Sequence, residues 1–248
     1  MSLFDTFDPN SEEILKPPIH PVDGFPETVI LTFEEESLQA LQSICEAKTA
    51  ATLSGGRDIP VYKFRWNSRE LGALQAIIGG AATAALVEEV LALGAKKVLL
   101  YGSCGVLDAS LAAGHFIIPT AAYRDEGTSY HYLPAGDYVD IPTAQRLGEI
   151  FDELNLPYVK GRVWTTDALY RETRNNMEKR KAEGCIAVEM ECASAMAVGQ
   201  FRSVPVYQFL YAEDSLDGDA WDARTWHCVP ASDYEKYLRV ALEVASRL

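Results

Sequence analysis

The stretch Val98-Leu-Leu-Tyr-Gly102-Ser103-Cys104-Gly105 joins an apolar run to a polar segment bounded by glycines. The apolar run predicts a strand that is buried on both faces, as in a parallel sheet covered by helices. The two glycines predict a tight turn after it, whose backbone N–H groups and Ser103 hydroxyl suit an oxyanion. Taken alone, the same pattern also fits a tight turn without a ligand.

Short apolar runs of this kind alternate with helical patterns along the chain. Strands are expected at residues 28–31, 61–64, 98–101, 115–118, 158–163, 186–188 and 204–211, and helices at 37–47, 70–93 (interrupted by Gly79 and Gly80), 143–154, 172–183, 191–200 and 233–247. This order predicts an α/β fold, a three-layer sandwich with a mixed, largely parallel central sheet flanked by helices. In such sheets, sites gather at the carboxyl ends of the strands.

Composition and charge limit the number of domains and the classes of partner that we expect. The 248 residues are 48% hydrophobic and 23% charged, and no linker-like stretch divides them. We therefore expect a single domain over residues 1–248, with residues 1–26 as an N-terminal arm. The formal net charge of -14 argues against a nucleic acid partner, so an anion would need a local positive pocket.

The cysteines and the apolar runs bear on location. The five cysteines contain no CxxC pair, and their odd number favours a reducing cytoplasm over a disulfide framework. The chain has no apolar run of membrane-spanning length and no signal-like start, so we expect no membrane partner. The four histidines show no metal-ligand spacing.

A second motif, Ile186-Ala-Val-Glu189-Met190-Glu191-Cys192-Ala193, ends an apolar run in two carboxylates on either side of a methionine. A carboxylate can accept both hydroxyls of a vicinal diol, and a thioether offers an apolar surface to a sugar. Acidic residues that complement a helix N-terminus are the alternative interpretation.

A third motif, Val206-Tyr-Gln-Phe-Leu-Tyr211-Ala-Glu213-Asp214-Ser215, is again a strand pattern that ends in carboxylates. An acid beside a departing base lowers the barrier to its release by donating or sharing a proton. A capping or turn role for Asp214 and Ser215 is the alternative.

In this order, the three motifs resemble the nucleoside phosphorylase family, which includes purine nucleoside phosphorylase, uridine phosphorylase and adenosylhomocysteine-type nucleosidases. The likeness extends from about His20 to the last helix. The segment Trp164–Tyr170 looks like the family's base-contacting segment, and Arg124–Tyr132 is similar to the uridine-phosphorylase-like branch.

The resemblance implies roles for the second and third motifs. Glu191 takes the position of the ribose-diol ligand, with Met190 against the sugar and Glu189 beside it. Asp214 takes the position of the catalytic acid that bonds the base in purine-acting members. His20 resembles a histidine that contacts the sugar from a neighbouring subunit, although a solvated loop histidine fits equally well.

The resemblance assigns the base to Thr166, Leu169 and Tyr170. An aromatic residue is usual in the family where this chain has Leu169. The base itself stays open, because Asp214 favours a purine and the segment Arg124–Tyr132 favours a pyrimidine.

Phosphate binding is the part of the resemblance that this sequence matches least. The first loop, Thr32–Ser37, lacks the family's glycine and arginine and carries three acids, which we expect to face solvent. Arg57 matches an arginine that the family lends across a subunit interface. The candidate phosphate ligands are Gly102, Ser103, Arg57, Arg124 and Arg171.

These assignments predict a nucleoside phosphorylase, a cytoplasmic pentosyltransferase of nucleotide salvage that releases a free base and ribose 1-phosphate. Phosphate is a co-substrate, and no metal or organic cofactor is implied. The active form is expected to be a homo-oligomer with a dimer as its minimum unit, and a hexamer is one assembly of such units. A nucleosidase that uses water is the first alternative, since hydrolytic members of the family also lack the phosphate arginines. A non-catalytic nucleoside-binding protein is the second.

Overall fold

The computed structural model describes residues 6–54, 56–226 and 228–248, so residues 1–5 of the expected arm lie outside the described residues. The strands are β1 (Thr28–Thr32), β2 (Lys48–Ser54), β3 (Asp58–Trp66), β4 (Arg69–Gln75), β5 (Lys97–Val106), β6 (Phe116–Asp125), β7 (Tyr138–Asp140), β8 (Tyr158–Thr166), β9 (Cys185–Glu189) and β10 (Val206–Ser215). The helices are α1 (Glu35–Ile44), α2 (Gly80–Leu93), α3 (Thr143–Glu153), α4 (Arg174–Ala182), α5 (Cys192–Arg202) and α6 (Ala231–Ala245), with short 3₁₀ turns η2 (Thr128–His131) and η3 (Leu169–Arg171).

The ten strands of the described residues belong to one mixed sheet, which runs in the order β10-β6-β8-β9-β5-β1-β4-β3-β2, with β7 on β6. Strand β10 also pairs with β5, so the strands β5, β10, β6, β8 and β9 close into a ring. Five of the described pairings are parallel and five are antiparallel, so the sheet is mixed as expected but no more parallel than antiparallel.

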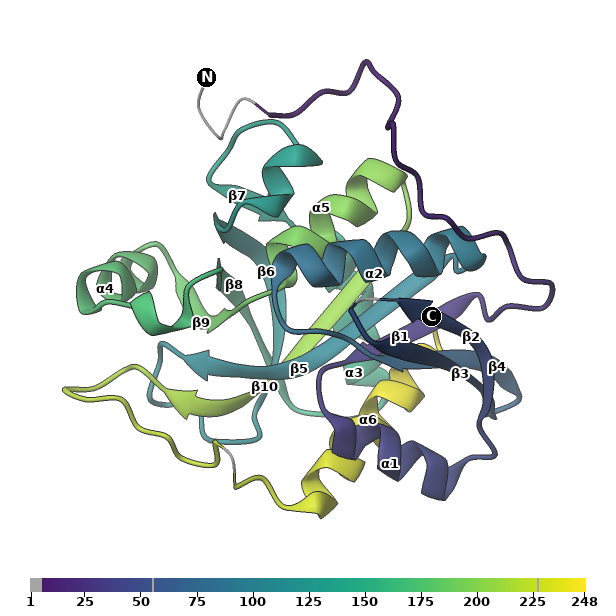
Figure 1. Cartoon of the computed structure of the whole chain (residues 1–248). Coiled ribbons are helices and arrows are strands. Elements are labelled where there is room, and N and C mark those ends of the chain that lie inside the picture. Colours follow the sequence, from purple (N-terminus) through teal and green to yellow (C-terminus); the bar gives the residue numbers. More distant parts are fainter. Residues whose placement is uncertain (1–5, 55, 227) are drawn as a thin grey trace.

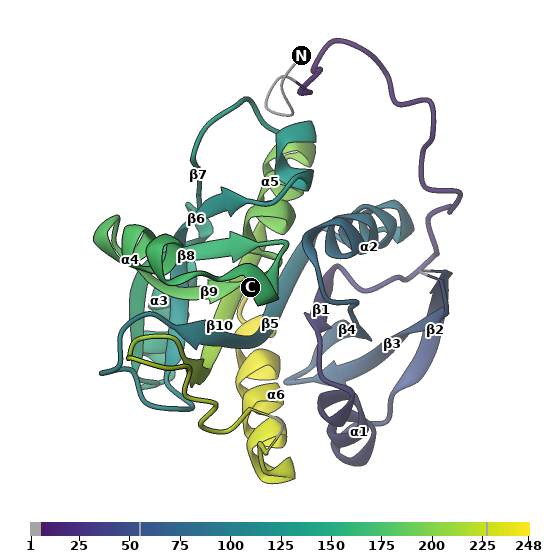
Figure 2. The same cartoon turned by 60° about the vertical axis from the view of Figure 1, so that its left-hand side comes forward.

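Helices cover the sheet on both sides (Figures 1 and 2). Helices α2 and α5 lie together on one side, and α1, α3 and α6 lie on the other. The central strand β5 is buried over most of its length, which explains why its sequence is an apolar run and not an alternating one. Among the described helices, none is both long enough and apolar enough to span a bilayer.

The expected helix over residues 70–93 is wrong in its first half. Residues Arg69–Gln75 form β4, which lies between β1 and β3. Four of its residues in a row are buried, and such a short apolar run fits a helix and a buried strand equally well by sequence pattern. The helix begins only at Gly80, after Gly79 with a φ of 107°, a value that favours glycine.

The expected turn at Gly102–Gly105 is also wrong, because β5 continues through it to Val106. The glycines serve close packing instead. A Cβ atom on Gly102 would lie 2.8 Å from the Phe33 ring, and one on Gly105 would lie 2.7 Å from Leu216. Since these residues pair with β10, the N–H groups do not form an open anion-binding loop.

Candidate active site

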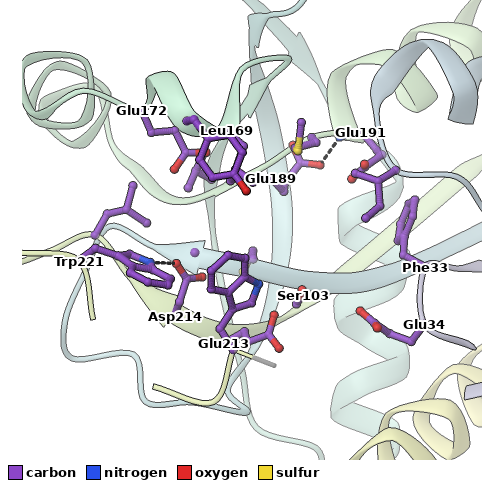
Figure 3. Close-up of a pocket in the computed structure, with 18 residues that line it drawn as sticks. Phe33, Glu34, Ser103, Leu169, Glu172, Glu189, Glu191, Glu213, Asp214 and Trp221 are labelled. Carbon is purple, nitrogen blue, oxygen red and sulfur yellow. Dashed lines mark hydrogen bonds between the residues drawn. The ribbon is translucent and has the colours of Figure 1, made fainter. Parts of the chain in front are cut away.

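A cavity of about 450 Å³ opens where the carboxyl ends of β1, β5, β9 and β10 meet. Figure 3 shows residues from these strand ends and from the loops after them converging on one space. Strands β1 and β10 run parallel to β5 and end at the same edge, and β9 pairs antiparallel with the end of β5 at Gly105 and Val106, so motifs far apart in sequence come together here. Six carboxylates line the cavity: Glu34, Glu172, Glu189, Glu191, Glu213 and Asp214.

The turn from β9 into α5 places Glu189, Met190 and Glu191 along one wall. The Glu189 carboxylate accepts the backbone N–H groups of Glu191 at 2.8 Å and Cys192 at 2.7 Å, and the Thr165 hydroxyl also donates to it. These bonds satisfy N–H groups that the start of α5 leaves without helical partners. Glu189 therefore holds the turn in shape, and Glu191 projects beyond it toward the N–H of Gly79.

Burial raises the pKa of both Glu189 and Glu191. The charge of Glu189 raises the pKa of Glu191 further. A buried carboxylate is unstable in its charged form unless it accepts hydrogen bonds. A ligand that brings hydroxyl donors would therefore stabilise these side chains.

The end of β10 carries two consecutive acids on one face. The register between β10 and β5 shifts between Ala212 and Asp214, which marks a β-bulge at Glu213. A bulge adds one residue to the strand and breaks the alternation of side chains, so Glu213 and Asp214 both line the cavity. Asp214 accepts the indole N–H of Trp221 at 2.6 Å, and burial raises its pKa.

The loop after β1 forms one end of the cavity, near Ser103. Phe33 packs over Gly102, and Glu34 follows it with its carboxylate toward Ser103 and Glu213 (Figure 3). Burial raises the pKa of Glu34, and the nearby charge of Glu213 adds to the shift.

The segment after β8 closes the other end. Leu169 and Tyr170 are exposed and line the cavity mouth. Thr166 is buried behind them, and its hydroxyl accepts the Ala168 N–H at 3.1 Å, so it shapes the segment. Glu172 lies on the same wall as Leu169, across the cavity from Trp221 and Asp214 in Figure 3, and burial raises its pKa to about 8, with Asp214 adding to the shift.

Comparisons with known proteins agree with this architecture. Residues 28–246 match the family model of the phosphorylase superfamily. The chain belongs to this superfamily. The purine nucleoside phosphorylase of Plasmodium falciparum is 30% identical over 181 residues, which cover 69% of this chain and 71% of that protein. A match to an uncharacterized mimivirus protein, R802, spans only 58% of that protein's length.

Solved structures of superfamily members share the fold. The purine nucleoside phosphorylase of Toxoplasma gondii, solved with immucillin-H, superposes with a TM-score of 0.77 over 96% of this chain and 98% of that chain, at 21% identity. An AMP nucleosidase of Bacteroides thetaiotaomicron superposes with a TM-score of 0.70 at 20% identity, over 91% and 90% of the two chains.

The residues that the sequence predicted as phosphate ligands lie in separate parts of the molecule. Of these residues, Ser103 alone lines the cavity, and Gly102 is buried beneath Phe33. Arg124 lies near the end of β6 and is buried against the following loop, where it donates to the Ser129 hydroxyl and the Pro134 carbonyl, both at 2.7 Å.

The remaining basic candidates are exposed and lie outside the cavity lining. Arg171 belongs to the turn η3, and Arg57 lines a separate hollow beside α1. His20 is exposed on the N-terminal arm. Within one copy of the chain, these side chains do not join the acids of the cavity.

Several lining residues were not anticipated. Glu35 and Glu36 are exposed, as expected for the first loop, but Glu34 lines the cavity. Trp221 and Trp226 come from the loop after β10, where the only sequence signal is two tryptophans close to the third motif.

Proposed function

We propose that this protein cleaves the N-glycosidic bond of a nucleoside with water as the attacking group. One observation carries the choice of water: among the described residues that line the cavity, six are acids and none is Lys, Arg or His. The shared superfamily supports the bond, since the named relative and the solved structures include nucleoside phosphorylases and a nucleosidase.

Electrostatics argues against phosphate in a cavity built by one chain. Two like unit charges 4 Å apart repel by about 4 kcal/mol at an effective dielectric constant near 20. Phosphate near Ser103 would face Glu34 and Glu213 without a described counter-charge from the lining. A neutral water molecule carries no such cost.

In the proposed reaction, the residues on each wall of the cavity have a separate role. Glu191 accepts the ribose hydroxyls and Met190 packs on the sugar, while the bond from C1′ to the base nitrogen stretches toward an oxocarbenium-like ribosyl cation. The bonding electron pair leaves with the base, to which Asp214 supplies a proton. Water adds its oxygen to C1′, and its proton passes to the Glu34 carboxylate.

A second candidate, phosphorolysis, is favoured by the name of the Plasmodium falciparum relative. It requires that Arg57 from a second copy of the chain supply the missing positive charge. The homo-oligomer expected from the sequence is then part of the catalytic unit.

The test is a panel of purine and pyrimidine nucleosides incubated with and without phosphate, with free base, ribose and ribose 1-phosphate measured separately. We expect base and ribose to form at the same rate in both conditions. Base formation that depends on phosphate, together with ribose 1-phosphate, would establish phosphorolysis instead. The matched variant is Arg57→Ala, which affects phosphorolysis alone. Release of no base from any nucleoside would identify a binding protein.

A further inference from the structure

One end of the cavity is an aromatic pocket. Tyr170, Trp221 and Trp226 all line the cavity, and the rings of the two tryptophans meet edge to face with centroids 4.8 Å apart. Leu169 and Trp221 lie on the same side of the space in Figure 3, opposite Phe33 and Glu34. Such walls suit a flat ring, which is the base of a nucleoside.

Two carboxylates share this end with the aromatic rings. Asp214 lies beside Trp221 in Figure 3 and Glu172 lies on the facing wall, and the charge of Asp214 raises the pKa of Glu172. No described residue donates a hydrogen bond to the Glu172 carboxylate or forms an ion pair with it, and Asp214 accepts a hydrogen bond from the neutral indole of Trp221. A neutral base leaves the charged forms of these acids without an opposite charge.

Arg224, whose charge acts on Asp214, is engaged elsewhere. Arg224 interacts with Asp214 over a distance, but its guanidinium donates to the Leu111 carbonyl and lies 3.7 Å from the Asp222 carboxylate. It does not line the cavity. Among the described residues that line the cavity, none brings a positive charge to this end, so a cationic ligand would supply one.

We propose that the preferred substrate is a cationic nucleoside, one whose base carries a fixed positive charge through alkylation or ribosylation of a ring nitrogen. Ribosyl pyridinium compounds and N7-alkylated purine nucleosides belong to this class. The inference rests on the proposed function for its chemistry. A flat cation over aromatic faces gains cation–π attraction, and Glu172 and Asp214 complete the pairing.

The chemistry of cleavage fits such a substrate. When the bond from C1′ to the ring nitrogen breaks, its electron pair cancels the positive charge of the ring, so the base leaves neutral without a proton. Water then adds to C1′ and gives up one proton. The products are ribose, a neutral base and that proton, and Asp214 acts as a carboxylate that stabilises the cation.

The experiment measures binding apart from turnover. Tryptophan fluorescence is titrated with 1-methylnicotinamide, which carries a fixed charge, and with nicotinamide, which has the same ring without the charge. We expect the cation to bind at least about tenfold more tightly, and its affinity to fall as salt rises. Glu172→Gln should remove most of the preference. Glu178→Gln is the matched control, because it deletes an exposed acid of α4 outside the cavity.

Equal affinities for the two compounds, or a preference that survives Glu172→Gln in a protein that keeps its melting temperature, would overturn the proposal. A second measurement compares kcat/KM for N7-methylguanosine and guanosine, each divided by its spontaneous hydrolysis rate. We expect the larger ratio for the cation, and an equal or smaller ratio would count against it. Charge-selective binding without release of any base contradicts the proposed function alone, whereas hydrolysis of neutral nucleosides without charge selectivity contradicts this inference alone.

Discussion

The backbone N–H of Gly79 donates a 2.6 Å hydrogen bond to Oε1 of Glu191. This bond joins the start of α2 to the start of α5 and fixes the Glu191 carboxylate at the wall of the cavity. Gly79 can present its N–H there because its φ is 107°, a conformation that other residues rarely adopt. The ribose assignment for Glu191 thus depends on a residue from a distant helix.

Glu191→Gln tests the ribose assignment. Glutamine keeps an oxygen that can accept the Gly79 N–H, but it loses the charge that strengthens bonds to sugar hydroxyls. A hydrogen bond to a charged group contributes about 1.5–3 kcal/mol, so we expect kcat/KM to fall roughly 10- to 150-fold with little change in melting temperature. Glu178→Gln serves as the charge control. An unchanged kcat/KM in the folded Glu191 variant would remove the assignment.

Gly105→Ala tests the position of Asp214. A Cβ atom at residue 105 would lie 3.1 Å from Asp214 Oδ1 and 2.7 Å from Leu216 Cδ1, so both must move. Overpacking of this kind costs about 1–3 kcal/mol in stability, and we expect a lower melting temperature together with a lower kcat. Gly127→Ala is the control, because a Cβ atom there meets nothing within 4 Å. Activity equal to that of the control would show that Asp214 tolerates displacement.

The sequence predicted well where the strands at the cavity end, because an apolar run followed by acidic residues is a local pattern that can be recognised in the sequence. Glu189, Glu191 and Asp214 are identified this way, and all three line the cavity. Strand β2 was missed because it is a largely exposed edge strand without an apolar pattern.

What the sequence did not predict depends on contacts between distant segments. The bulge that turns Glu213 inward is defined by pairing with β5, and Glu34 lines the cavity next to Phe33, which packs on Gly102. Neither leaves a periodic signal. Likewise, nothing local to Arg124 reveals that loop carbonyls occupy its guanidinium.

Trp221→Phe tests Asp214 as an acid. The indole N–H stabilises the charged carboxylate and lowers its pKa, so its loss should raise the pKa of Asp214. A general acid works only while it is protonated, and activity on neutral nucleosides declines as pH rises through its pKa. We therefore expect the alkaline limb of the kcat profile to move to higher pH in the variant. A limb that stays in place, or moves to lower pH, would contradict the acid role.

Glu172→Gln tests whether the Glu172 carboxyl is buried at the aromatic end of the cavity, because a buried carboxyl makes protein stability depend on pH. The pKa of Glu172 is raised from its ordinary value of 4.5 to about 8, so the folded state holds this proton more tightly than the unfolded state. Its contribution to the unfolding free energy is fully present below about pH 4.5 and is lost as pH rises toward 8. Glutamine does not titrate, so the melting temperature of the variant relative to the wild type should increase between pH 5 and pH 9. Each kcal/mol corresponds to about 2–4 °C for a protein of this size. The same scans on Glu178→Gln give the baseline, and a difference that does not vary with pH would show that Glu172 is solvated.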